Sequence, residues 1–109
     1  MQDNKDIVML TNPAMELLFN ALTKEWYRET SMFSSISKKV MHPAYQQIIG
    51  MGEQAVPLIL HELQRRPAHW FEALRAITGD SPVPPEHAGI VRIMAADWIE
   101  WGKRRGYIT

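Results

Sequence analysis

The sequence predicts an all-α protein that folds as one compact bundle of five helices. Apolar residues recur at spacings of three and four along most of the chain, which is the repeat of an amphipathic helix. Proline and glycine punctuate these stretches, and no segment alternates polar and apolar residues over the length of a strand. A chain of 109 residues suits a single domain, residues 1–109, in which residues 1–11 are expected to be a flexible N-terminal segment.

The first helix is predicted over residues 13–29. Asn12 is a suitable N-cap, and Pro13 suits the first helical position, where its missing N–H costs nothing. The apolar stripe of this helix consists of Met15, Leu18, Phe19, Leu22 and Trp26.

Two short helical segments follow. Phe33, Ile36 and Val40 have helical spacing. Ser31 is expected to cap this helix, and His42 and Pro43 are expected to end it. Residues 43–52 form the next segment, which Gly50 or Gly52 is expected to stop in a left-handed conformation.

Residues 53–67 and 70–79 are predicted to form a helical hairpin that turns at 65–67. The first helix carries Val56, Ile59, Leu60 and Leu63 on one face. The second carries Trp70, Ala73, Leu74 and Ile77, and we expect it to end at Gly79 with positive φ.

The segment 80–85 contains three prolines and is predicted to be a rigid spacer inside the domain. The last helix is predicted to begin at Pro85 or Glu86 and to run to about Arg105, with Gly106 as its cap. Its stripe consists of Ile90, Met94, Trp98 and Trp101.

Part of the chain resembles a HEAT-type helical repeat. The resemblance rests on segments 50–63 and 70–77, which read GMGEQAVPLILHEL and WFEALRAI. In that family, helix pairs stack into solenoids that bind other proteins. Because solenoids need about three repeats and this chain has room for at most two, we expect a closed bundle that contains one HEAT-like hairpin.

A second pattern is similar to a group of short uncharacterised bacterial proteins. It comprises segments 42–52, 69–86 and 98–107, which read HPAYQQIIGMG, HWFEALRAITGDSPVPPE and WIEWGKRRGY. The resemblance implies a bacterial source and a self-standing domain, and it implies no chemistry.

Composition excludes several classes of protein. Cysteine is absent, which removes disulfides and thiolate metal sites and suits the cytoplasm. The N-terminus lacks the pattern of a signal peptide, and no apolar run reaches the ~20 residues that span a bilayer, so no membrane association is expected. Twelve basic and twelve acidic side chains balance, which disfavours a dedicated nucleic-acid binder.

No residue pattern specifies a reaction, so no enzyme activity and no cofactor are predicted. The four histidines lack metal-ligand spacing, so we interpret them as caps or surface residues and predict no metal site. Ser34, Ser35 and Ser37 lie in no glycine-flanked elbow. Gly50 and Gly52 lack the rest of a phosphate-binding fingerprint and indicate a turn.

The leading hypothesis is a small cytoplasmic protein-interaction or regulatory module whose partner is another protein or a second copy. The junction at residues 28–39 is rich in hydroxyls and charges, and its surroundings supply the predicted partner-binding residues: Tyr27, Arg28, Thr30, Ser34, Lys38 and Tyr45. All six are expected to be at least partly exposed on one side. The alternative is a nucleic-acid binder that uses Lys38, Lys39 and the tail from Lys103 to Arg105.

Overall fold

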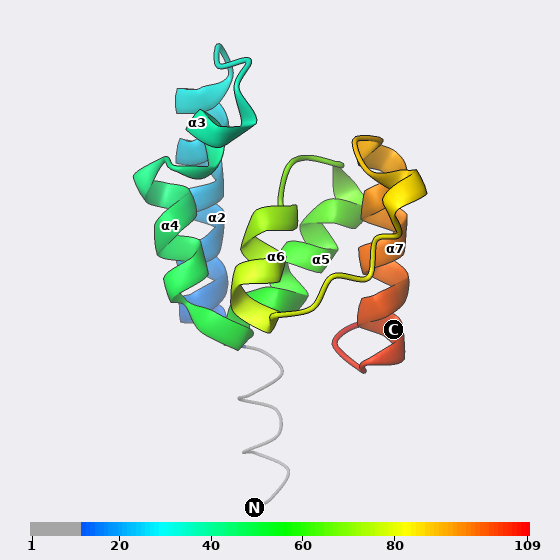
Figure 1. The fold of residues 1–109 in the computed structure, drawn as a ribbon. Coiled ribbons are helices and arrows are strands. Elements are labelled where there is room, and N and C mark those ends of the chain that lie inside the picture. The colour runs from blue at the N-terminus through cyan, green and yellow to red at the C-terminus, as the bar shows by residue number, and fades with distance from the viewer. Residues whose placement is uncertain (1–11) are drawn as a thin grey trace, which may run out of the picture.

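The structure is a computed structural model that describes residues 12–109, so the predicted N-terminal segment 1–11 lies outside the described residues. The described residues contain α-helices and short 3₁₀ helices and no strand, which confirms the all-α fold (Figure 1). The elements are α2 (Pro13–Thr30), α3 (Ile36–Val40), α4 (Pro43–Gly50), η1 (Gly52–Gln54), α5 (Ala55–Arg65), α6 (Phe71–Thr78), η2 (Pro85–His87) and α7 (Val91–Arg104).

Helix α2 begins as the sequence predicts. The Asn12 side chain accepts a hydrogen bond of 3.2 Å from the Met15 amide, and Pro13 follows it. Ser31 does not open the next helix, because its helical backbone places it at the end of α2. The cap of α3 is Ser35, whose extended backbone lets its hydroxyl accept a hydrogen bond of 3.3 Å from the Lys38 amide.

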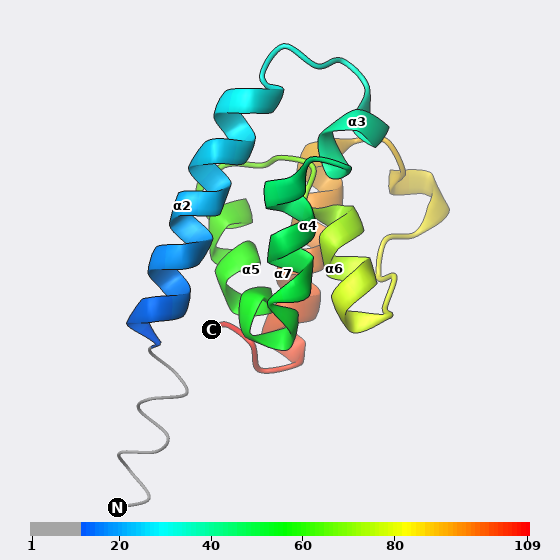
Figure 2. The same ribbon diagram turned by 90° about the vertical axis from the view of Figure 1, so that its left-hand side faces the viewer.

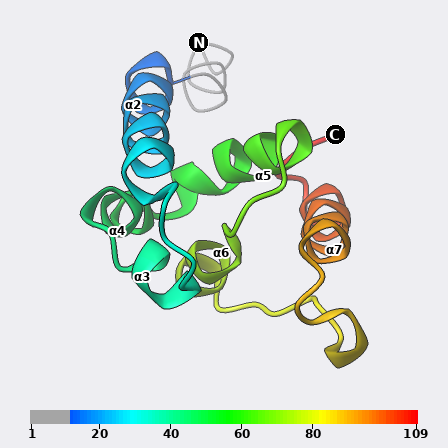
Figure 3. The same ribbon diagram turned by 90° about the horizontal axis from the view of Figure 1, so that it is seen from above.

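Helices α4 and α5 each pack more against the second α-helix after them in the chain than against each other. Helix α4 packs against α2 and α6, whereas α5 packs mainly against α7 (Figures 2 and 3). The chain does turn at residues 65–67, as predicted, but α5 has more extensive contact with α7 than with α6. Gly102 explains the close approach of α5 and α7, because a Cβ at this position would collide with the buried Leu60 side chain.

The core near α2 is aromatic. The Trp26 ring lies 4.9 Å from Tyr45 and 4.6 Å from Trp70, measured between ring centroids. Tyr45 and Trp70 stack with an interplanar angle of 11°. All three side chains are buried, so α2, α4 and the start of α6 are held at fixed positions relative to one another.

The segment before α7 differs from the prediction. Pro85–His87 forms only the short helix η2, and α7 begins at Val91. Gly89, with φ of 87°, interrupts the chain between them, since a continuous α-helix has negative φ throughout. The spacer 80–85 is anchored at Asp80, whose carboxylate accepts a hydrogen bond of 2.9 Å from the Trp101 indole and pairs with Arg105 at 2.8 Å.

Candidate functional site

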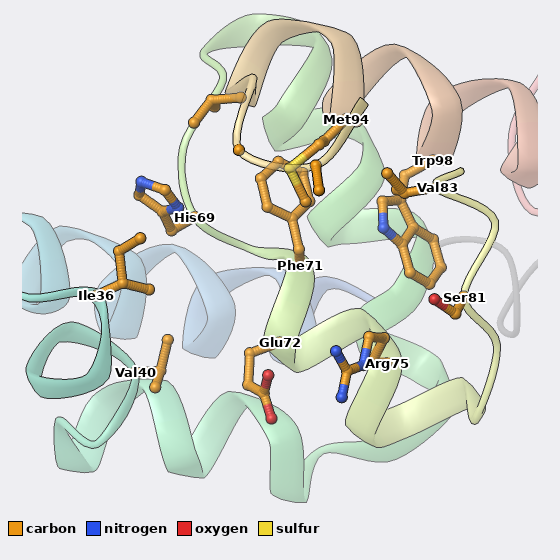
Figure 4. Close-up of a pocket in the computed structure, with 13 residues that line it drawn as sticks. Ile36, Val40, His69, Phe71, Glu72, Arg75, Ser81, Val83, Met94 and Trp98 are labelled. Atoms are coloured by element: carbon orange, nitrogen blue, oxygen red, sulfur yellow. The ribbon is translucent and has the colours of Figure 1, made fainter. Parts of the chain in front are cut away.

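An open groove lies between α3, α6, the spacer 80–85 and the start of α7, and we call it the apolar groove (Figure 4). Its volume is about 370 Å³. Apolar side chains from four separate segments form most of its wall: Ile36, Val40, Phe71, Val83, Met94 and Trp98.

The neighbouring elements fix the shape of this groove. Phe71 begins α6 directly after the buried Trp70, so the aromatic core holds the groove floor in place. Met94 and Trp98 are one turn apart on α7, and their side chains lie near Phe71 in Figure 4. Ile36 remains 51% exposed, so an apolar rim faces solvent on the α3 side.

Three polar side chains that carry or can carry charge also line the apolar groove. Glu72 and Arg75 are exposed on α6. His69 is half-buried, and this burial, reinforced by the charge of Lys39, lowers the pKa of its imidazole below the usual value. His69 is therefore predominantly neutral at neutral pH.

A second hollow adjoins the apolar groove, with a volume of about 350 Å³. Its lining includes Lys39, Arg66 and His69 and contains no carboxylate among the described residues, so we call it the basic hollow. His69 and Val91 line both cavities, so the two cavities adjoin each other at these residues. Lys39 is held in position because its carbonyl accepts a hydrogen bond of 2.7 Å from the Trp26 indole.

Tyr27 forms one wall of the basic hollow and is held on two sides. Its hydroxyl donates a hydrogen bond of 2.6 Å to Glu62, which also accepts a bond of 2.7 Å from Arg65. The Arg66 guanidinium lies 4.0 Å from the centroid of the Tyr27 ring. Burial, followed by the hydrogen bond and charge of Glu62, raises the pKa of Tyr27 above its ordinary value.

The predicted partner-binding residues do not form a single exposed surface. Tyr27 and Thr30 line the basic hollow, Lys38 lines a shallow depression with Phe33 and Met41, and Arg28 and Ser34 are exposed.

The expected exposure was wrong for Thr30 and Tyr45, which are 3% and 0% exposed. The Thr30 hydroxyl donates a hydrogen bond of 2.6 Å back to the Trp26 carbonyl. Tyr45 stacks on Trp70 and uses its hydroxyl internally, so neither side chain can present its polar group to a partner.

Sequence reasoning missed the apolar groove because its wall comes from segments that are far apart in the chain. The spacer 80–85 was expected only to connect two helices, yet Ser81 and Val83 line the groove. Lys39, Arg66 and His69 also belong to separate segments, and no local spacing connects them. The exposed Ile36 within a polar junction was the available signal.

Glu25, Glu29 and His42 bring potential metal-ligand atoms within 4.8 Å of one another. The Nδ1 atom of His42 accepts a hydrogen bond of 3.0 Å from the Ala44 amide, which fixes the proton of the neutral ring on Nε2. Nε2 lies 2.6 Å from Glu29 and donates to it. A metal on Nε2 would place the proton of the neutral ring on Nδ1, which already accepts from the Ala44 amide, so we explain this arrangement as the cap of α4.

The basic tail lies far from α3. Helix α7 runs away from the end of the molecule that carries α3, so its last turn is at the opposite end (Figure 1). Arg104 pairs with Glu100 at 3.7 Å, and Arg105 pairs with Asp80 at 2.8 Å. The tail therefore does not form one surface with Lys38 and Lys39.

The chain matches no protein-family model, no curated protein and no solved structure. Within residues 12–109, no helix has both the length and the apolar character needed to cross a membrane.

Proposed function

We propose that this protein is a small, non-catalytic binding module that holds an apolar segment of another protein in the apolar groove. The observation that carries the proposal is the mostly apolar wall around an open volume of about 370 Å³, with Ile36 exposed at its rim. Side chains of this kind bind an apolar partner because contact removes their surface from water. An amphipathic segment can then place successive apolar side chains along the trough.

The chemistry of the lining residues supports binding rather than catalysis. Ser81 and His69 both line the groove, but no hydroxyl in its described lining is hydrogen-bonded to a histidine. A serine nucleophile requires such a base within hydrogen-bond reach. The proposal therefore assigns the groove recognition and no reaction.

The alternate packing of helices supports the proposed kinship with helical repeats. Helices α4 and α6 pack together, as do α5 and α7, which is the contact pattern between equivalent helices of two successive helix pairs. Stacked helix pairs are the building principle of α-solenoids, which present surfaces to other proteins. A bacterial cytoplasm is the proposed setting, since a chain without cysteine suits a reducing compartment.

Selection from a random peptide-phage library tests this function. Three proteins are compared: the natural chain, Ile36→Glu and Leu17→Glu. Both positions are exposed, at 51% and 71%, so neither substitution disturbs buried packing. Ile36 lines the groove, whereas Leu17 lies in the first turns of α2 and lines no part of it.

We expect peptides rich in apolar residues to bind the natural chain and Leu17→Glu alike. A charge in the groove rim should weaken their binding by about tenfold or more, because the contact must then desolvate a carboxylate. Equal binding to Ile36→Glu would refute the groove as the site. Binding of the protein to itself in sedimentation, abolished by the same substitution, would make a second copy the partner.

A further inference from the structure

We infer that the partner segment carries acidic residues beside its apolar ones, with the carboxylates bound in the basic hollow by Lys39 and Arg66. The inference rests on the proposed function and specifies its partner. A ligand that fills the apolar groove can extend past His69 and Val91 directly into the basic hollow, since both residues line both cavities. Two adjoining cavities thus offer an apolar part and a cationic part.

Arg66 is prepared to bind a carboxylate. Its guanidinium carbon lies 4.0 Å from the centroid of the Tyr27 ring, so the group is held against that ring by a cation–π interaction. The N–H donors lie in the plane of the guanidinium and point away from its face, and none is bonded to another side chain within residues 12–109. Tyr27 is itself fixed by Glu62, so little conformational entropy is lost when Arg66 binds.

The charges around the hollow leave it positive. Arg65 neutralises Glu62 through two hydrogen bonds, of 2.7 and 3.1 Å, so Glu62 does not cancel Arg66. Lys39 makes no ion pair within the described residues. The partial negative charges at the C-terminal ends of α2 and α5 offset part of this positive charge, but each amounts to only about half an elementary charge.

The distribution of cations elsewhere agrees with this assignment. Arg28, Arg65, Arg104 and Arg105 all pair with carboxylates. Among the cations that make no ion pair within residues 12–109, Lys39 and Arg66 line the basic hollow and Arg75 lines the apolar groove. Lys24 and Lys103 also make no ion pair within residues 12–109 but line neither cavity, so they serve as matched controls.

Glu72 lines the apolar groove but not the basic hollow. Arg75 lines the groove as well, so the charged side chains of the groove balance, whereas the lining of the basic hollow carries Lys39 and Arg66 and no carboxylate. The two cavities together set the direction of the bound segment, with apolar side chains over Phe71 and Met94 and acidic side chains over Arg66.

Three pools of synthetic peptides test the inference. All share a centre randomised among Leu, Ile, Phe and Met, and they differ only in flanking residues, which are Asp and Glu, Ser and Gly, or Lys and Arg. Binding is measured by fluorescence anisotropy with the natural chain, with the double variant Lys39→Glu/Arg66→Glu and with the control Lys24→Glu/Lys103→Glu. A second double variant, Lys39→Met/Arg66→Met, removes the two positive charges without adding negative ones. Circular dichroism measures whether each variant keeps its helical content. Binding of a single-stranded DNA oligonucleotide to the same proteins is measured as well.

We expect the natural chain and the control to bind the acidic pool about tenfold more tightly than the neutral pool, with weaker preference at high salt. The double glutamate variant should prefer the basic pool, and the methionine pair should show no charge preference. Equal binding of all pools, abolished by Ile36→Glu, would overturn this inference and leave the proposed function standing. Binding of no pool would overturn both. Tight DNA binding that depends on Lys39 and Arg66 would assign the hollow to nucleic acid instead.

Discussion

Tyr45 connects α4 to the beginning of α6 through both hydrogen-bonding roles of one hydroxyl. The hydroxyl donates to the His69 carbonyl at 3.0 Å and accepts from the Ala73 amide at 2.9 Å. The sequence places Tyr45 beside polar residues in a short helix, which suggested a surface position. The ring nevertheless stacks on Trp70, because burying a large aromatic surface outweighs the cost of a hydroxyl that finds both its partners inside.

Tyr45→Phe should lower the free energy of unfolding by about 1 to 3 kcal/mol, because the buried Ala73 amide loses its acceptor. Urea denaturation of the two proteins provides the measurement. Tyr107→Phe serves as the control, since that half-buried ring stacks on Trp101 without a hydrogen bond from its hydroxyl to a described residue. Equal stability of Tyr45→Phe and the natural chain would show that the hydroxyl is dispensable.

Both Tyr27 and Tyr45 should resist ionisation in the folded protein. Burial raises the pKa of each phenol above its ordinary value of 10.0. A raised pKa in the folded state stabilises the protein fully below pH 10 and stabilises it progressively less as the pH rises above that value. Alkaline titration followed by phenolate absorbance and by circular dichroism should show these two tyrosines ionising together with loss of helix. Ionisation of all three tyrosines near the ordinary value, with the helices intact, would contradict their burial.

Helix ends were predictable where a single residue type meets a backbone requirement. Gly79 ends α6 with φ of 75°, and Gly106 follows α7 with φ of 82°, as the sequence indicates. The start of α7 was not predictable in this way, because Pro85 and Glu86 satisfy the same local rules as a true helix start. The left-handed Gly89, with the non-helical backbone of Ala88 and Ile90 on either side of it, separates η2 from α7.

Gly79→Ala should cost more than the ~1 kcal/mol of an ordinary glycine change, because alanine strains the left-handed conformation. Space is not the reason, since nothing lies within 4 Å of a Cβ built at this position. Gly50→Ala is the matched control: Gly50 is the last residue of α4, does not have positive φ and has equal space, so this variant should be as stable as the natural chain or more stable. Thermal denaturation of both variants is the measurement. Equal stability of Gly79→Ala and Gly50→Ala would refute the left-handed end of α6 at Gly79.

The pairing of elements could be predicted less well than the elements themselves. The stripe containing Val56, Ile59 and Leu60 does face the core, as its spacing predicts. Spacing identifies a buried face but not its partner, and the hairpin interpretation assumed that α5 would pack mainly on its neighbour in sequence. The partner of α5 is instead α7, where Gly102 removes the side chain that would keep the helices apart.

At the scale of the whole molecule, the sequence predicted the class of fold and not the site. The all-α fold follows from a pattern repeated along the chain, so errors in one segment do not change it. The apolar groove and the basic hollow depend on where α3, α6 and α7 lie relative to one another. Lys39, Arg66 and His69 meet only in three dimensions, which explains why the predicted surface included Tyr27 and Thr30 but missed their charged neighbours.

The most direct test of the apolar groove is amide chemical-shift mapping of the isotopically labelled chain during titration with a selected peptide. The proposed site predicts the largest shifts at Ile36, Phe71, Val83, Met94 and the residues of the basic hollow, with little change near Leu17 and Lys103. Because the opposite end of α7 lies far from the groove, the two outcomes are clearly separated (Figure 1). Shifts that centre on the last turn of α7, or on the first turns of α2, would contradict the assignment of function to the groove.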